Sequence, residues 1–378
     1  MIVELHLIQN FSPSCLNRDD ANAPKSCEFG GYPRARISSQ CLKRAIRKYF
    51  ADKSNELFLE TDLAVRSKLL IERLVTLLGN SGKDSTMARK IVTFVIEDQL
   101  IVKDSKTSTI LFLGSDEINR LHDAFLSLWD KLVAIKGSID EPTSAIINKK
   151  TLQSERTRLI SNIFDVFKRG TKAVDIALFG RMIAELPDLN MHVNAACQVA
   201  HAISTNKSTM ELDFYTAAED LQCLGGSGTA MMGIVEYNSS CFYRYSLLDV
   251  GQLNVNLQRD NALTTLSAIA YVKASVFAIP AGKQNSMAAH NLPSYIRAIV
   301  RDRGSPRSLA NAFLTPVQSI GGDNLVVESI RKLEGYNNSL CNMYGRGGIK
   351  LDETLSEYDN TGSEGLNGLI NKLETTLQ

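Results

Sequence analysis

The sequence predicts an α+β fold in which strand-like segments at the start of the chain and after residue 172 enclose a helical region. Three observations support this expectation. Apolar and polar residues alternate at the N-terminus, which is the period of a half-buried strand. Apolar residues recur every three or four positions in much of the region from 51 to 171, which is the period of a helix. The 378 residues are 44% hydrophobic, which suffices for a real core in one large domain or two smaller ones.

The first expected element is a strand over Ile2–Ile8. The apolar side chains at positions 3, 5 and 7 share one face, while Glu4 and His6 point to the other. A strand with this pattern is expected to bury one face and to leave the other in solvent.

A basic helix follows, with Ser38 or Ser39 as its N-cap. Its apolar stripe is formed by Leu42, Ala45, Ile46 and Tyr49, and its flanks carry the i, i+4 pairs Lys43 with Arg47 and Arg44 with Lys48. The helix is therefore expected to dock on a core and to present cations outward.

The region from Ala51 to Thr171 is predicted to be a helical insertion. One helix is expected to begin after Ser115, and a second is expected around Leu159–Phe167, before Gly170. Strands are predicted again in three later segments, with a helix from about Ala262 to Phe277 that Pro280 terminates; the strands are Val174–Ile183, Phe242–Leu248 and Tyr295–Arg301. The order strand, helix, strand, strand, helix, strand is that of a ferredoxin-like or RRM-like domain.

Charge is unevenly distributed although the formal net charge is only +1. Between Gly31 and Phe50 there are six basic residues and no acidic one, whereas the segment from Leu351 to Gln378 carries six acids against Lys372 alone. We therefore expect that one end of the chain can attract phosphate and that the other cannot.

The seven cysteines are scattered and contain no CxxC pair, so neither a disulfide framework nor a zinc site is expected. A reducing cytoplasm fits this usage. The chain shows no signal peptide and no apolar stretch approaching the ~20 residues of a membrane span. No cofactor and no membrane contact are predicted.

Several ordered segments of the sequence resemble one protein family. SPSCLNRDD is followed by FGG and RARISSQCLKRAIRK, and then by VDIALFGRM, QVAHAISTN, DFYTAAEDL, FYRYSLL, PAGKQNS and SLANAF. In this order they resemble the backbone subunit of Cascade, the type I-E CRISPR surveillance complex (the CasC family). The similarity covers almost the whole chain and is weakest in the helical insertion and the acidic tail.

The resemblance implies a discontinuous RRM-like palm over residues 1–50 and 172–336. It also implies a helical finger domain at 51–171, a protruding β-hairpin thumb at 204–236, and a C-terminal segment at 337–378 that contains the acidic tail. The implied partners are crRNA, target DNA paired to the guide, further copies of the chain arranged head to tail, and the large, small and crRNA-end-capping subunits. In such a complex base pairing reads the sequence and the protein holds the backbone. The resemblance further implies a binding protein without enzymatic activity.

The candidate RNA-binding residues of the basic helix are Ser38, Gln40, Lys43, Arg44 and Arg47. They combine a helix N-terminus with hydroxyl, amide and cationic donors on the first turns. A solvated helix face is the other interpretation, and the resemblance favours the RNA-binding one.

Six other positions, in three pairs, complete the expected RNA interface. Phe214 and Tyr215 lie in a polar stretch, and their rings offer sequence-tolerant stacking to bases, although either ring could instead anchor the hairpin. Arg181 and Met182 match a family position next to the displaced nucleotide, although a Met is often a core residue. Lys283 and Gln284, in a loop after Pro280, are within reach of a phosphate by the same resemblance.

Asp19 and Asp20 carry the alternative function. Neighbouring carboxylates beside a bound RNA could hold a divalent cation, as expected for a metal-assisted ribonuclease of the same fold, like the type III backbone proteins. The other interpretation is that they fix their loop through local hydrogen bonds. No HExxH, Walker or GxGxxG motif is present, so no catalytic or metal-binding residue is predicted.

Overall fold

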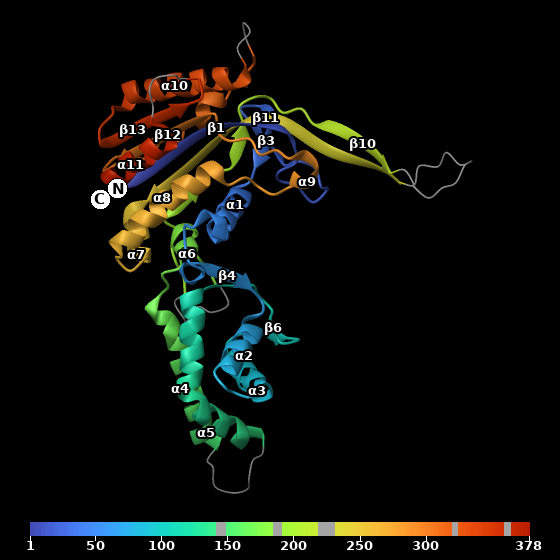
Figure 1. The fold of residues 1–378 in the computed structure, drawn as a ribbon, viewed down its shortest axis with the longest axis vertical. Helices are drawn as coiled ribbons and strands as arrows, with labels where there is room; N and C mark the ends of the chain where they lie inside the picture. The colour runs from blue at the N-terminus through green and yellow to red at the C-terminus, as the bar shows by residue number, and fades with distance from the viewer. Residues whose placement is uncertain (141–148, 184–190, 218–230, 320–323, 359–363) are drawn as a thin grey trace, which may run out of the picture. The chain divides into compact units, whose positions relative to one another are not determined.

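The computed structural model describes residues 1–140, 149–183, 191–217, 231–319, 324–358 and 364–378 (Figure 1). The chain forms two compact units. The first unit comprises 1–55, 197–251 and 265–378, and the second comprises 56–196 and 252–264. Helices and antiparallel strands both contribute, so the predicted α+β class is confirmed.

An antiparallel sheet forms the centre of the first unit (Figure 1). Its four central strands lie in the order β12, β1, β11, β9, where the bounds are β1 Ile2–Ser14, β9 Ala202–Ser204, β11 Met231–Asp249 and β12 Tyr295–Arg301. With α1 (Ser39–Ala51) after β1 and α8 (Asn261–Phe277) after β11, the order is that of a ferredoxin-like domain. Pairing runs residue by residue from Ile2 opposite Asp249 to Phe11 opposite Ser240.

Further strands extend this sheet at both edges. One edge is continued by β3 and β2, the other by β13, while β8 and β10 pair with β11; the bounds are β2 Ser26–Phe29, β3 Tyr32–Ile37, β8 Cys197–Val199, β10 Glu211–Ala217 and β13 Ile349–Ser356. Most of the described part of the segment that was expected to be an acidic tail is therefore part of the fold, in β13 and in a C-terminal helix. Asp352 of β13 pairs with Arg297 at 2.7 Å, and Glu353 pairs at 3.0 Å with Lys372 of α11 (Gly365–Leu377).

Helices cover both faces of the sheet. Leu5 and Leu7 of β1 lie against Leu42 and Ile46 of α1, as the apolar stripe predicts. On the opposite face Ile8 belongs to a core with Leu333 of α10 (Leu325–Tyr344). Short helices complete the unit, namely α9 Gln284–Met287 and the 3-10 turns Lys53–Asn55 and Ala310–Phe313, while most of α7 (Val250–Asn256) belongs to the second unit.

The expectation that Glu4 and His6 face solvent is wrong. Both are fully buried, because α10 covers their side of the sheet. Their polar atoms are paired: Glu4 accepts from Arg301 Nε, and His6 Nδ1 lies 2.8 Å from the hydroxyl of Tyr243. Burial first, and then the charges of Arg297 and Arg301, lower the pKa of His6 to about 3.

The predicted strand at Val174–Ile183 is also wrong. Val174–Phe179 forms the helix α6, which ends at Gly180 with a positive φ of 78°. Its residues from 174 to 178 are all buried, so their apolar run has no exposed face from which a period could be read. The second strand of the ferredoxin-like order is instead β9, which has only three residues.

The second unit is mainly helical and has its own core. Its helices are α2 Leu70–Asn80, α3 Ser85–Ile96, α4 Ser115–Asp140, α5 Lys149–Phe164 and α6, with 3-10 turns at Glu60–Asp62 and Asp165–Arg169. Two small two-stranded sheets accompany them, β4 (Ala64–Ser67) with β7 (Leu111–Gly114) and β5 (Val102–Lys103) with β6 (Lys106–Thr107). The helices that were expected after Ser115 and around Leu159 are both present.

In the part of the chain that the structure describes, every helix is too short or too polar to cross a membrane.

Candidate nucleic-acid interface

A groove of about 450 Å³ opens on the first unit between three segments that are distant in the sequence. They are the loop after β1, the groove-facing flank of α1 and the loop after α8. The lining residues that the argument uses are Asn17, Arg18, Asp19, Arg44, Lys48 and Gly282. Three of the sequence segments that resemble the CasC family thus meet in one place.

The position of α1 is fixed at its N-terminus. The hydroxyl of Ser38 accepts a hydrogen bond from the Cys41 N–H at 3.3 Å, which makes Ser38 the N-cap. The Ser38 N–H donates to Asn17 Oδ1 at 2.8 Å and so ties the helix to the loop after β1. Ser38 is itself buried, so its role in this structure is to position the helix rather than to offer a free hydroxyl.

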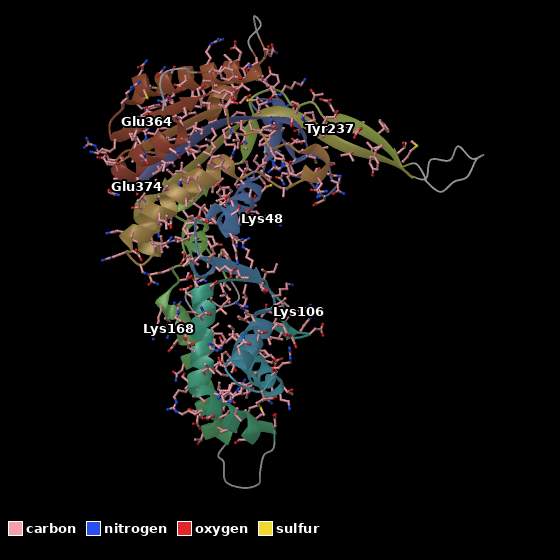
Figure 2. The ribbon with its side chains drawn as sticks, in the orientation of Figure 1. Lys48, Lys106, Lys168, Tyr237, Glu364 and Glu374 are labelled. Atoms are coloured by element: carbon pink, nitrogen blue, oxygen red, sulfur yellow. The ribbon has the colours of Figure 1, made fainter. Side chains whose placement is uncertain are left out.

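The cations of α1 lie on two different flanks. Because a turn of helix takes 3.6 residues, Arg44 and Lys48 fall together, and both are exposed and line the groove. Figure 2 labels Lys48 on this helix. Lys43 and Arg47 fall on the neighbouring flank and are half-buried. Lys43 lies close enough to Cys197 to act on its pKa, which burial raises to about 12.

The loop after α8 closes on itself and approaches the β1 loop closely. Gln284 donates through Nε2 to the carbonyls of Pro280 at 3.1 Å and Ala289 at 3.2 Å, so its amide holds the loop shape. A side chain on Gly282 would collide with the backbone carbonyl of Leu16, so the two loops can touch only because a glycine stands there. The adjacent Lys283 is half-buried and has a left-handed backbone.

The NRDD loop is held by its own side chains. Asp19 Oδ1 accepts hydrogen bonds from the backbone N–H groups of Ala21 at 2.9 Å and Ala23 at 3.0 Å, and Arg18 donates to Asn22 at 3.3 Å. This is the loop-fixing arrangement that was weighed against a metal site. Within the described ranges no three His, Cys, Asp or Glu side chains come together as a metal site would require.

Two arginines from the segments that resemble the family are buried. Arg34 donates to the carbonyls of Ser204 and Thr205, both at 2.8 Å, and has no exposed surface. Arg181, in the second unit, forms a bidentate pair with Glu117 at 2.6 and 2.9 Å, and both side chains are excluded from solvent. The structure thus gives both arginines a structural role and leaves the expected RNA contact of Arg181 without an accessible group.

Met182 differs from its neighbour Arg181. It is 80% exposed on the second unit and is not a core residue. It therefore stays a candidate contact, within a unit that the structure describes separately from the groove.

The β10/β11 hairpin places its two aromatic side chains on opposite faces. Phe214 lies opposite Ile234, and Tyr215 lies opposite Gly233. Phe214 is 65% exposed and shares its face with the exposed side chains of Leu212 and Ile234. The ring of Tyr215 lies against Gly233, where a Cβ would collide with it.

The paired part of the hairpin carries acids and no base. Between 211 and 217 and between 231 and 237 its only charged residues are Glu211, Asp213 and Glu236. Tyr237, at the end of the second range, is labelled in Figure 2. Residues 218–230, which include the rest of DFYTAAEDL and the GGSG sequence, lie outside the described ranges. The hairpin strands are therefore suited to contact bases rather than phosphates.

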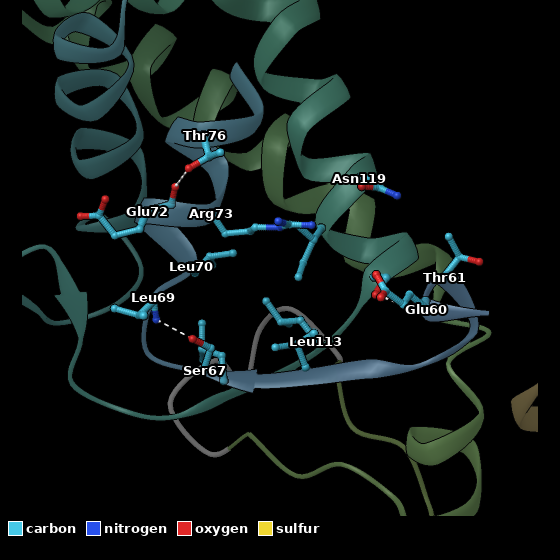
Figure 3. Close-up of a pocket in the computed structure, with 14 residues that line it drawn as sticks. Glu60, Thr61, Ser67, Leu69, Leu70, Glu72, Arg73, Thr76, Leu113 and Asn119 are labelled. Atoms are coloured by element: carbon cyan, nitrogen blue, oxygen red, sulfur yellow. Dashed lines mark hydrogen bonds between the residues drawn. The ribbon is translucent and has the colours of Figure 1, made fainter. Parts of the chain in front are cut away.

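A second cavity, of about 510 Å³, lies in the helical unit (Figure 3). Leu70, Leu113 and Ile118 contribute apolar walls, while Arg73 extends from α2 across it. None of the candidate RNA-binding residues lines this cavity.

The sequence prediction missed two residues of the groove. Lys48 follows Arg44 by one turn, so the helical period contained the signal, whereas Arg18 lies in a loop, where no period marks its side chain as a contact. Of the predicted RNA-binding residues only Arg44 is among those that line the groove, while Gln284 and Ser38 shape its walls. Asp19, named for the alternative function, lines it as well.

The fold and the groove define a ferredoxin-like α+β protein with a basic groove beside its first helix. The chain belongs to a family of Cas proteins, the CT1975-like proteins, whose sequence profile matches residues 3–376. A chain of a "CRISPR RNA-guided surveillance complex, pre-nicking" is similar over 100% of both chains, with 26% identity and a TM-score of 0.81. A chain of another "CRISPR RNA-guided surveillance complex" matches over 99% of each chain with 23% identity and a TM-score of 0.69, a likeness of fold alone. No curated protein matches the chain.

Proposed function

We propose that the chain is a non-catalytic backbone subunit of a CRISPR RNA-guided surveillance complex of type I-E, in which it binds crRNA. The observation that carries the proposal is the groove in which Arg18, Arg44 and Lys48 converge. Membership of a Cas family and the 26% identity to a chain of such a complex support it.

The groove residues suit a sugar-phosphate backbone better than a base. Arg18, Arg44 and Lys48 are exposed cations on a rigid loop and a capped helix, whereas the groove contains no aromatic side chain. Phosphate contacts of this kind position a strand without reading its sequence. The guide bases then stay available for pairing with target DNA, which supplies the specificity.

The hairpin supplies the second part of the proposal. Copies of the chain assemble head to tail along the crRNA, with further large, small and end-capping subunits as partners. The exposed ring of Phe214 stacks on a base of the strand held by the next copy, while Tyr215 stabilises the hairpin through its contact with Gly233.

The alternative function is a metal-assisted ribonuclease that uses Asp19 and Asp20. One carboxylate oxygen of Asp19 already accepts two backbone hydrogen bonds, which favours the loop-fixing role. We expect the purified chain to leave paired target RNA intact with magnesium or manganese present. Cleavage by the parent chain that disappears in Asp19→Ala or Asp20→Ala variants would contradict the proposal and would identify the chain as a ribonuclease.

The decisive experiment is to sequence RNA that copurifies with the chain from a host that carries the CRISPR array. Repeat-derived guide fragments are the expected result. In an Arg44→Ala/Lys48→Ala variant the yield of these fragments should fall. RNA of unrelated sequence in both preparations, in the same amount, would contradict the proposal.

A further inference from the structure

Two turns at one end of the first unit's sheet are held together by backbone contacts. One follows β12 and contains Arg303, and the other joins α10 to β13 and contains the GRGG sequence, Gly345–Gly348. The Asp302 N–H donates to the Gly348 carbonyl at 2.9 Å. Gly348 has a φ of 79°, and a Cβ there would collide with the Arg303 backbone, so the turns pack only with glycine at this position.

Three arginines converge on these turns, and we call them the arginine patch: Arg303, Arg307 and Arg346. Arg303 and Arg346 are exposed. Arg307 donates through Nη2 to the backbone carbonyl of Tyr344 at 3.2 Å, and its guanidinium carbon lies 5.9 Å from the centre of the Tyr344 ring. Its other terminal nitrogen, Nη1, is buried and has no hydrogen-bond partner among the described residues.

The carboxylates beside the patch are already neutralised. Glu4 accepts from Arg301 Nε, from the backbone N–H of Arg307 at 2.6 Å and from the Tyr245 hydroxyl at 3.1 Å. Asp302 pairs with Lys350 at 3.2 Å, and this contact holds the pKa of the Asp302 carboxyl below its usual value. The positive charge of the patch is therefore available to an external anion.

An exposed aromatic surface adjoins these cations. Tyr344 is 63% exposed and Met343 is 74% exposed, at the C-terminal end of α10. Planar guanidinium groups bind phosphate through paired donors, and an exposed ring beside them provides a surface for a base. An acidic protein segment would use the cations and would gain nothing specific from the exposed phenol ring.

We propose that the arginine patch and Tyr344 form a second contact surface for single-stranded nucleic acid, with phosphates on Arg303 and Arg346 and a base on Tyr344. The surface is separate from the groove at α1. Ile2, at the start of β1, lies opposite Arg301, whereas the groove begins at Leu16 beyond the end of β1. The 13 residues of β1 at about 3.3 Å each place the two surfaces roughly 40 Å apart. The patch therefore contacts another part of the strand or another strand.

The test measures binding of a fluorescently labelled polyuridine RNA to the full chain by anisotropy at several salt concentrations. In an Arg303→Ala/Arg346→Ala variant the slope of log affinity against log salt should flatten by about 1.4, at about 0.7 per phosphate contact. Tyr344→Ala should weaken binding about five-fold or more. After ultraviolet crosslinking to the RNA, the peptide that contains Tyr344 should carry a nucleotide adduct.

Arg331→Ala is the matched control, because Arg331 is a partly exposed cation of α10 about 20 Å along the helix from Tyr344. It should leave the slope unchanged, and thermal melting should show that all variants are folded. Equal slopes for the patch variant and the parent would overturn the proposal. The patch would be assigned to an acidic protein instead if polyglutamate displaced the labelled RNA as effectively as unlabelled RNA does and if Tyr344→Ala had no effect on RNA binding. Binding by the groove is tested separately with Arg44→Ala/Lys48→Ala, so the two proposals can fail independently.

Discussion

The two cationic flanks of α1 allow a charge-matched test of the groove. Arg44 and Lys48 line it, whereas Lys43 and Arg47 lie on the neighbouring flank. The double variants Arg44→Ala/Lys48→Ala and Lys43→Ala/Arg47→Ala remove the same charge from the same helix. Alanine has the highest helix propensity, so neither variant should unfold α1.

The expected difference follows from counterion release. Each phosphate contact on a single strand contributes about 0.7 to the slope of log affinity against log salt, so the groove variant should lose about 1.4. Between about 50 and 200 mM salt, the parent should then lose about seven-fold more affinity than the groove variant does. The flank variant should keep a slope closer to that of the parent.

The assay is the affinity for a labelled single-stranded RNA, measured at four or more salt concentrations with folding checked by thermal melting. A flank variant that loses the larger part of the slope would refute the assignment of the groove and would restore Lys43 and Arg47 as the main contacts. Equal slopes in the parent and in both variants would show that α1 does not bind phosphate.

Three further predictions concern stability and the wall of the groove. Glu117→Gln should lower the free energy of unfolding by about 3–5 kcal/mol, because it leaves the buried Arg181 charge unpaired. Glu72→Gln, which breaks the more exposed pair with Arg89, should have a far smaller effect, and chemical denaturation measures both. Because the folded pKa of His6 is about 3 and the unfolded value is 6.5, its contribution to stability is complete above pH 6.5 and is lost as the pH falls toward 3. It should amount to about 2 kcal/mol between pH 7 and 5, and a His6→Gln variant should lack it in denaturation curves. Gly282→Ala should weaken RNA binding by displacing the loop after α8, and an unchanged affinity in the folded variant would contradict this role.

The sequence predicted the ferredoxin-like order because its longer strands and capped helix carry clear periodic signals. Tyr295–Arg301 was identified correctly, and Ser38 is the N-cap that the pattern indicated. The second strand was missed because β9 has three residues, fewer than any period can show. The burial of Glu4 and His6 could not be predicted either, because it depends on a helix more than 300 residues later in the chain.

The groove was predictable in part. The helical period separates the two cationic flanks of α1, but only the loops that begin at Leu16 and Ile279 decide which flank borders a cavity. Charge counting also treats Arg34 like Arg44, although the first is buried among backbone carbonyls and the second is exposed. Long-range packing of this kind leaves no local trace in the sequence.

The hairpin aromatics show what a strand assignment adds to a composition argument. In a strand, neighbouring side chains point to opposite faces, so Phe214 and Tyr215 cannot both stack on one base.

The charged residues of the paired hairpin strands are all acidic, so any affinity that Phe214 adds should come from stacking and should be insensitive to salt. Phe214→Ala should therefore lower RNA affinity by about 1–3 kcal/mol per site at every salt concentration, with an unchanged slope and melting temperature. Tyr215→Ala is the control, and it should instead speed amide exchange at Gly233. A changed slope in Phe214→Ala would mean that the hairpin contacts phosphate, and that its acids are neutralised in the assembled complex.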